Sequence, residues 1–299
     1  MRFEFTFQGG REMLRLALPS PWSAGAMFIQ SAPAGAPHSA ITMIDHAALS
    51  GQFARAFGND RFQAPTPYDP VVYAISNHDA GWIDFDRDPA TDPETGLPYT
   101  VFATPAPLIL PTSKGSPDYN QRHHPYSGLL SSMHTWGIYN GRYGFTTAGR
   151  LSRIAPEDKP AVDAMLAIEL SRQNALKAEL STSPETAAWV EEGRLFQNYK
   201  LLQFCDLLAI YFNTRHAAAR SEQVFTHVPQ SKDGDSNISI TPLGGSDYAL
   251  APFPLACSGA EFAFAYRNIS PGQNEREGGW AKVLRNAPTA WETFRLVAG

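Results

Sequence analysis

We expect the fold to be organised around the stretch LLQFCDLLAIYF, residues 201–212, which is apolar on nearly every side when drawn as an α-helix. A helix without a polar face belongs in the centre of a protein, because other elements must cover each of its sides. The helical pattern runs from about residue 186 to residue 215 and is the longest in the chain. The sequence therefore predicts a core of helices packed around this segment.

One carboxylate interrupts this apolar stretch. Asp206 falls in line with Leu195, Leu202 and Ala209 on one side of the predicted helix. Burying a carboxylate is costly unless a cation, a metal ion or a network of hydrogen-bond donors compensates its charge. Asp206 is therefore predicted to serve a functional or metal-binding role.

Two other predicted helices carry a histidine on an apolar face. Residues 43–57 place His46 at helical spacing with Phe53, and residues 125–138 place His134 among apolar neighbours. A buried imidazole needs a polar partner, and a metal ion is one partner that would explain both histidines.

The dipeptide His78-Asp79 ends a further predicted helix. Asp69 followed by Pro70 is typical of a helix start, and the apolar positions that follow share a face with His78. At the last turn of a helix, adjacent histidine and aspartate side chains can reach one cation from neighbouring directions. The pair is therefore a candidate metal site.

Between Gly81 and about Tyr126 the chain is polar and rich in proline, which predicts a long functional loop. Residues 156–180 are predicted to form an amphipathic structural helix. Short strands are expected near both ends of the chain, at residues 3–7, 13–18, 26–30, 237–241, 248–251, 261–267 and 291–297.

These patterns predict a mainly α fold with a small β subdomain formed by the two terminal segments. The expected division is an N-terminal β segment over residues 1–42, a helical metal-binding core over residues 43–220, and a C-terminal β segment over residues 221–299 that packs with the N-terminal strands.

The amino-acid composition of the chain argues against several classes of protein. The net charge is −5 and basic runs are absent, which argues against a nucleic-acid partner bound through its phosphates. The apolar runs are too short to span a membrane, and the start of the chain lacks the pattern of a signal peptide. The two cysteines, Cys205 and Cys257, do not form a secreted-type disulfide framework. We expect a cytoplasmic protein that acts on a small molecule.

The order of these residues resembles the HD superfamily of metalloenzymes over residues 43–215. The resemblance lies in His46, in NHDAGW at residues 77–82 and in the late Asp206, and it extends to a bacterial branch without an assigned activity. It implies an HD-type helical core in which His46, His78, Asp79 and Asp206 bind one metal ion.

Dinuclear members of that superfamily add two histidines, and His134 and His124 are the corresponding residues here. His123 could replace His124 or contact substrate. The implied cofactor is one or two divalent ions, namely Fe, Mn, Zn or Mg, with Fe favoured in a dinuclear site.

Three functions remain open. The first is a phosphohydrolase that uses metal-activated water, with His78 and Asp79 at its catalytic centre. The second is a mixed-valence diiron oxygenase, and the third is a non-catalytic ligand-binding or regulatory module. Cations for a phosphate could come from Arg122, Lys114, Arg142 or Lys200. Trp82 stands where many members carry a substrate-binding lysine, and its indole could stack on a flat or sugar-like ligand.

Overall fold

The computed structural model describes residues 26–147 and 149–299. The strands predicted over residues 3–7 and 13–18 lie outside the described residues.

Strands from three parts of the chain form one eight-stranded sheet, with the order β3-β1-β2-β7-β8-β6-β5-β4. Its strands are β1 (Ala26–Ile29), β2 (His38–Ile41), β3 (Tyr99–Thr100), β4 (Gln223–Ser231), β5 (Gly234–Gly244), β6 (Asp247–Ala251), β7 (Ala260–Ile269) and β8 (Thr289–Ala298). The pairs β1–β3 and β6–β8 are parallel and the other pairs are antiparallel, so the sheet is mixed.

The expectation of a mainly α fold with a small β subdomain is wrong, because this sheet makes the protein an α/β fold. Three of its strands, β2, β3 and β4, lie outside the predicted strand segments. β2 has only four residues. β4 contains Pro229, which is typical of a strand end or loop, but β4 lies at the edge of the sheet, where a missing N–H is tolerated. β3 has only two residues and lies inside a polar segment.

Six helices longer than eight residues pack below the sheet in the described part of the chain. They are α1 (Met43–Ala56), α2 (Tyr68–Ser76), α3 (Ala106–His123), α4 (Pro125–Tyr139), α6 (Lys159–Leu180) and α8 (Glu192–Thr214). The shorter helices are α5 (Gly141–Gly144), α7 (Pro184–Ala187), α9 (Gln273–Glu277) and α10 (Trp280–Asn286), with single 3₁₀ turns at Ala80–Trp82, Arg150–Arg153 and Ala217–Ala219.

The long loop predicted between Gly81 and Tyr126 is interrupted by α3, a helix of 18 residues. Pro111 and Pro117 lie inside this helix. A proline in the interior of a sequence segment normally argues against an α-helix there, because it lacks the backbone N–H and clashes with the preceding turn. Its buried side packs against α4 and the 3₁₀ turn at Ala80–Trp82, so tertiary contacts outweigh the unfavourable local sequence.

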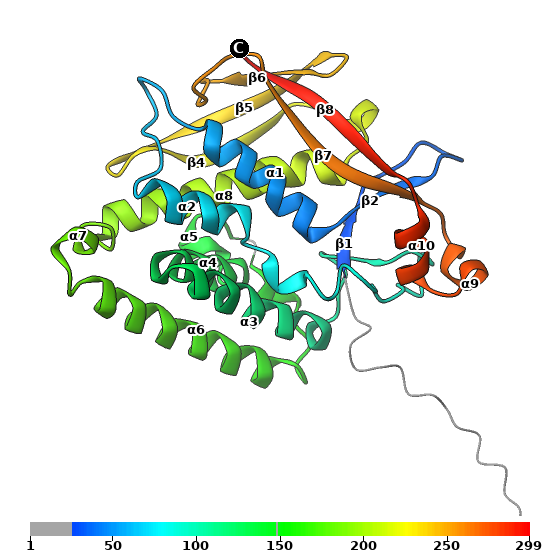
Figure 1. Cartoon of the computed structure of the whole chain (residues 1–299), viewed down its shortest axis with the longest axis horizontal. Helices are drawn as coiled ribbons and strands as arrows, with labels where there is room; N and C mark the ends of the chain where they lie inside the picture. Colours follow the sequence, from blue (N-terminus) through cyan, green and yellow to red (C-terminus); the bar gives the residue numbers. More distant parts are fainter. Residues whose placement is uncertain (1–25, 148) are drawn as a thin grey trace, which may run out of the picture.

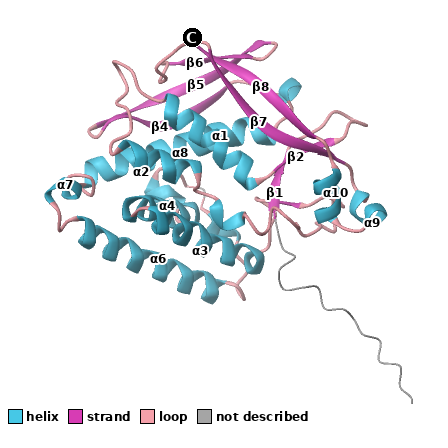
Figure 2. Ribbon diagram, in the orientation of Figure 1, coloured by secondary structure: helices cyan, strands magenta, loops and turns pink. Residues whose placement is uncertain are grey.

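The helices form layers beneath the sheet (Figures 1 and 2). The sheet covers α1 and α8, and α3, α4 and then α6 lie farther from it. The central helix α8 is buried along most of its length, as its sequence predicts. Phe212 of α8 stacks on Phe294 of β8 with ring centroids 3.7 Å apart, which joins this helix to the sheet.

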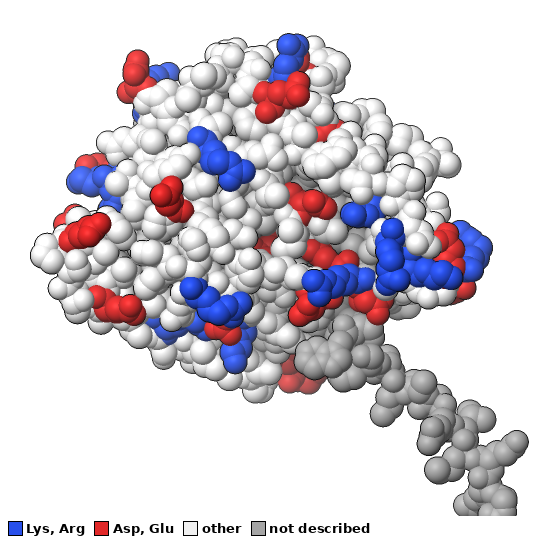
Figure 3. Space-filling model, viewed as in Figure 1, with Lys and Arg blue, Asp and Glu red and all other residues white. Residues whose placement is uncertain are grey.

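The surface carries mixed charge, with acidic and basic side chains interspersed on the face shown in Figure 3. Within the described residues, no helix is both long and apolar enough to cross a lipid bilayer.

Candidate metal centre

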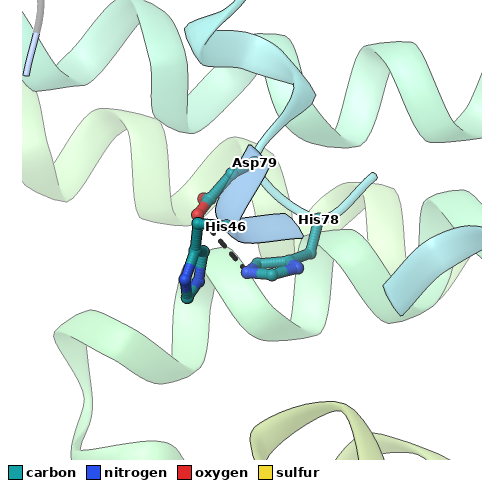
Figure 4. A group of neighbouring side chains, drawn as sticks. All are labelled: His46, His78 and Asp79. Carbon is teal, nitrogen blue, oxygen red and sulfur yellow. Dashed lines mark ion pairs between the residues drawn. The ribbon is translucent and has the colours of Figure 1, made fainter. Parts of the chain in front are cut away.

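Four side chains from three segments of the chain meet in the helical layers. His46 comes from α1, His78 and Asp79 follow the end of α2, and Asp206 comes from the middle of α8. Both histidines are almost completely buried, and Asp206 is 5% exposed. Figure 4 shows His46, His78 and Asp79 pointing toward one another.

The position of His46 is fixed by the way α1 begins. The Thr42 hydroxyl accepts a hydrogen bond from the backbone N–H of Asp45 at 3.0 Å. The two carboxylate oxygens of Asp86 accept from the N–H groups of Met43 and Ile44 at 2.9 and 3.1 Å. These contacts satisfy the first N–H groups of α1, which have no partners within the helix. They fix the three residues that precede His46.

The Nδ1 atoms of both histidines are occupied by hydrogen bonds. His78 Nδ1 donates to the carbonyl oxygen of Ile75 at 2.8 Å, and His46 Nδ1 donates to Oδ1 of Asn213 at 2.9 Å. In a neutral imidazole with a protonated Nδ1, the Nε2 atom carries a lone pair. Both rings therefore present a metal-binding Nε2 atom to the centre of the cluster.

These two Nε2 atoms face carboxylate oxygens. His46 Nε2 lies 3.2 Å from Oδ1 of Asp206 and 3.9 Å from Oδ2 of Asp79. His78 Nε2 lies 3.3 Å from Oδ2 of Asp79 and 3.7 Å from Oδ1 of Asp206. Lone pairs and carboxylates repel one another at such distances unless a proton or a metal cation lies between them.

The charges of the cluster are strongly coupled. Burial disfavours a charged imidazole, but the carboxylates of Asp79 and Asp206 outweigh it and hold the pKa of His78 well above its usual value. Burial likewise opposes ionisation of Asp206, yet contacts with His46 and His78 bring its pKa well below the usual range. The cluster is therefore arranged to hold positive charge between its acids.

His134 of α4 extends this group of side chains. Its ring centroid lies 4.9 Å from that of His78, and its Nδ1 atom lies 2.8 Å from the amide nitrogen of Gln203. Burial and the neighbouring His78 lower the pKa of His134 to about 4, so its imidazole is neutral at physiological pH. A neutral imidazole can bind a metal ion or accept a proton.

A cavity of about 490 Å³ opens onto the cluster, and Asp79, His134 and Asp206 lie in its wall. Arg142 and Arg150 line the same cavity. Nη2 of Arg142 lies 3.5 Å from Oδ2 of Asp206, the carboxylate oxygen that does not face the histidines. The site therefore combines a cluster suited to a metal ion with guanidinium groups suited to an anion.

One family model matches this chain over residues 34–270, and its description is protein of unknown function (DUF3891). The chain belongs to the DUF3891 family. No curated protein and no solved structure gives a significant match. All five residues of the cluster fall inside the region that matches DUF3891.

Two histidines of this DUF3891 chain, the predicted ligand His124 and its alternative or substrate contact His123, do not join the cluster. His124 caps α4, where its Nδ1 accepts from the N–H of Tyr126 at 3.0 Å. His123 stacks on Tyr73 with ring centroids 3.5 Å apart. Neither histidine lines the cavity. The bend between α3 and α4 separates them from His134, which lies more than two helical turns farther along α4.

Three predicted substrate contacts also lie elsewhere. Arg122 packs over the ring of Tyr119, and Lys200 pairs with Asp235 at 2.6 Å. Trp82 is 4% exposed, packs in the core and borders only a small void of about 50 Å³ beside His78. The structure thus uses the indole of Trp82 mainly for packing.

Sequence patterns did not identify several residues that support the site. Asn213 orients His46, Gln203 contacts His134, Arg150 lines the cavity, and the ring of Phe28 in β1 lies 4.4 Å from that of His46. None of these four belongs to a recognisable motif.

Proposed function

We propose that this protein is a metal-dependent phosphohydrolase with one divalent cation held by His46, His78, Asp79 and Asp206. One observation carries the proposal. Nε2 of His78 is buried and lies 3.3 Å from Oδ2 of Asp79 and 3.7 Å from Oδ1 of Asp206, but it makes no well-aligned hydrogen bond with any of the described residues. Buried polar atoms are normally paired, and a cation would pair this atom and both acids together.

The donor set suits a transition-metal ion. The ligand atoms of His46, His78 and Asp79 all lie within 4.8 Å of one another, and Asp206 adds a second carboxylate. Imidazole and carboxylate ligands favour Fe, Mn or Zn. A cation bound there would act as a Lewis acid and lower the pKa of a water molecule for attack on phosphorus.

The residues around the cluster supply the remaining requirements of phosphate-ester hydrolysis. Arg142 and Arg150 place two guanidinium groups in the cavity wall, where they can bind phosphate oxygens. They provide the positive charge that a substrate-binding lysine would supply at the position occupied by Trp82. The Val101 carbonyl accepts a hydrogen bond from Nη2 of Arg150, which orients this side chain at the cavity.

Hydrolysis is favoured over the diiron alternative because of the number of available ligands. His134 is one additional imidazole beside the four proposed ligands, whereas a second metal of the type expected from the resemblance would require two. His123 and His124 lie outside the cavity. We therefore assign His134 either to the coordination of the single cation or to proton transfer at the substrate.

The test combines metal analysis with a substrate panel. Purified protein is loaded with Mn²⁺, Fe²⁺ or Zn²⁺, desalted and analysed for metal, and phosphate release is measured from mono- and diesters. We expect about one cation per chain and chelator-sensitive phosphate release. His78→Ala should lose both, whereas His216→Ala, which alters a histidine outside the cluster, should retain both.

Three results would overturn the proposal. Wild-type protein that retains no metal after loading would rule out the metal centre. Retained metal together with an inactive substrate panel would instead favour the non-catalytic binding module. An oxygen-dependent change in the spectrum of an iron-loaded chain would favour the oxygenase.

A further inference from the structure

A second cavity, of about 400 Å³, lies next to the metal-centre cavity and shares one wall residue with it, Arg142. Three segments form it: the turn that carries Arg142, the middle of α8 and the strand β4. Its polar lining includes Arg142, Lys200, Gln203 and His227. Among the described residues that line it, none is acidic.

Strained backbone conformations occur around this cavity. In the described part of the chain, positive φ angles outside glycine occur at Arg142 (53°), Tyr143 (59°) and His227 (58°). Such conformations are costly for residues with a Cβ atom and concentrate at functional sites. Two of these three residues, Arg142 and His227, line the second cavity.

The surrounding structure maintains both strained positions. Arg142 lies in the left-handed turn Gly141–Gly144, which the hydrogen bond from the Tyr143 hydroxyl to Gln173 at 3.0 Å ties to α6. His227 lies in β4 where the register with β5 shifts between Phe225 and Val228. Register irregularities of this kind redirect a side chain. At this one, His227 forms part of the cavity wall.

Unpaired polar atoms give the second indication. Nη1 of Arg142 is buried and has no partner within the described residues. Gln203 is 6% exposed, and its Oε1 atom is also buried without a partner there. Turning the amide would pair Oε1 with a protonated Nδ1 of His134 and leave the NH₂ group free instead. The unpaired Nη1 donor of Arg142 suits an acceptor-rich ligand, and the NH₂ group of Gln203 suits one in the turned orientation.

Apolar rings complete the cavity. The ring centroid of Phe145 lies 5.1 Å from Nζ of Lys200 and 5.0 Å from the ring centroid of His227. Phe204 and Phe225 also line the wall. Asp235, which pairs with Lys200, is not among the lining residues, so the cavity combines positive charge with flat apolar surfaces.

We propose that this second cavity binds a small organic oxyanion, a carboxylate or a phosphate attached to a flat apolar group. The oxyanion lies against Arg142, Gln203 and the rim formed by Lys200 and His227, and the apolar group packs against Phe145. Because Arg142 lines both cavities, the ligand contacts a residue that also borders the metal centre. This assignment goes beyond the proposed phosphohydrolase activity and does not depend on it.

The test is calorimetric titration of the full chain with phenylphosphonate and, in parallel, benzoate, in the presence of a chelator so that the metal centre contributes no cation. Saturable binding of at least one probe is expected. Lys200→Met should weaken it about tenfold, since it removes a charge-assisted contact. His227→Asn, which removes the imidazole from the rim of the cavity, should also weaken it. Asparagine at position 227 tolerates the positive φ angle and keeps the backbone intact.

Two control variants show whether the probe binds in the second cavity or elsewhere. Lys232→Met removes a lysine that also pairs with an aspartate, Asp233, but does not line the cavity, and it should leave binding unchanged. Arg150→Ala alters the metal-centre cavity and not the second cavity, so it should weaken only a binding event at the metal centre and leave unchanged the binding that Lys200→Met weakens. Absence of binding by the wild type, or binding weakened by Arg150→Ala and not by Lys200→Met, would overturn the proposal.

Discussion

Nε2 of His46 lies 3.2 Å from Oδ1 of Asp206, although the two residues are 160 positions apart in the sequence. The Nδ1 atom of the same imidazole already donates to Asn213. The contact therefore places a metal-binding nitrogen against a buried carboxylate. A positive charge, from a proton or a metal ion, is needed to stabilise this contact. Substitutions of Asp206 and of Asn213 therefore test the metal centre.

Asp206→Asn should weaken metal binding by at least about a hundredfold, because substitutions of residues that merely orient ligands already cost about ten- to a hundredfold. The change keeps the size of the side chain and removes only its charge. Competition titration with a metallochromic chelator gives the affinity. Asp163→Asn, which alters an exposed aspartate on α6, is the control and should bind metal as the wild type does. Equal affinities in the two variants would remove Asp206 from the ligand set.

Asn213→Ala should weaken metal binding by about ten- to a hundredfold while every proposed ligand remains present, since the amide oxygen orients the ring of His46. Asn213→Asp keeps an acceptor at this position and should retain more affinity than the alanine variant. The same competition titration measures both. If alanine and aspartate behave alike, the hydrogen bond to His46 has no role in the site.

Gly81→Ala should destabilise the fold by about 1–3 kcal/mol, the usual cost of overpacking. A Cβ atom at position 81 would lie 2.2 Å from the carbonyl oxygen of Thr112 and 2.6 Å from the backbone nitrogen of Ser116, both in α3. To avoid this clash, α3 would have to move away from the turn that follows His78 and Asp79.

Urea denaturation measures this effect, and Gly234→Ala is the matched control because only the distal hydroxyl of Ser231 lies near its Cβ position. The control should change the free energy of unfolding little. A Gly81→Ala protein as stable as the control would show that the close contact with α3 is absent in solution.

Cys257 should react with a thiol reagent in the native protein, whereas Cys205 should react only after unfolding. Cys257 is exposed, and Cys205 is completely buried in α8. Burial and the neighbouring Asp206 raise the pKa of the Cys205 thiol, which suppresses the reactive thiolate. Mass spectrometry of the labelled protein, with and without urea, assigns each site. Rapid native labelling of Cys205 would contradict the central position of α8.

The helices that carry the cluster could be predicted because each is strongly amphipathic or apolar over many residues. His46 and His134 occupy apolar helical faces in the sequence, and Asp206 interrupts an apolar run. By contrast, α3 could not be predicted, since Pro111 and Pro117 oppose a helix locally and packing against α4 decides the outcome.

The sheet was underestimated for a similar reason. β2, β3 and β4 lie outside the predicted strand segments, and they pair with β7, β1 and β5, respectively. Sheet pairing joins residues far apart in sequence, and a short or proline-containing strand gives little indication of its partner.

By itself, the sequence determined the central helix, the helical faces that carry His46 and His134, and the unusual buried charge of Asp206. These features follow from local periodicity and from the cost of burying polar groups. Only the tertiary structure decided that His46, His78, Asp79, His134 and Asp206 converge, that His123 and His124 lie outside, and that Arg142 borders two cavities. Those relationships depend on how distant segments pack, which local patterns do not specify.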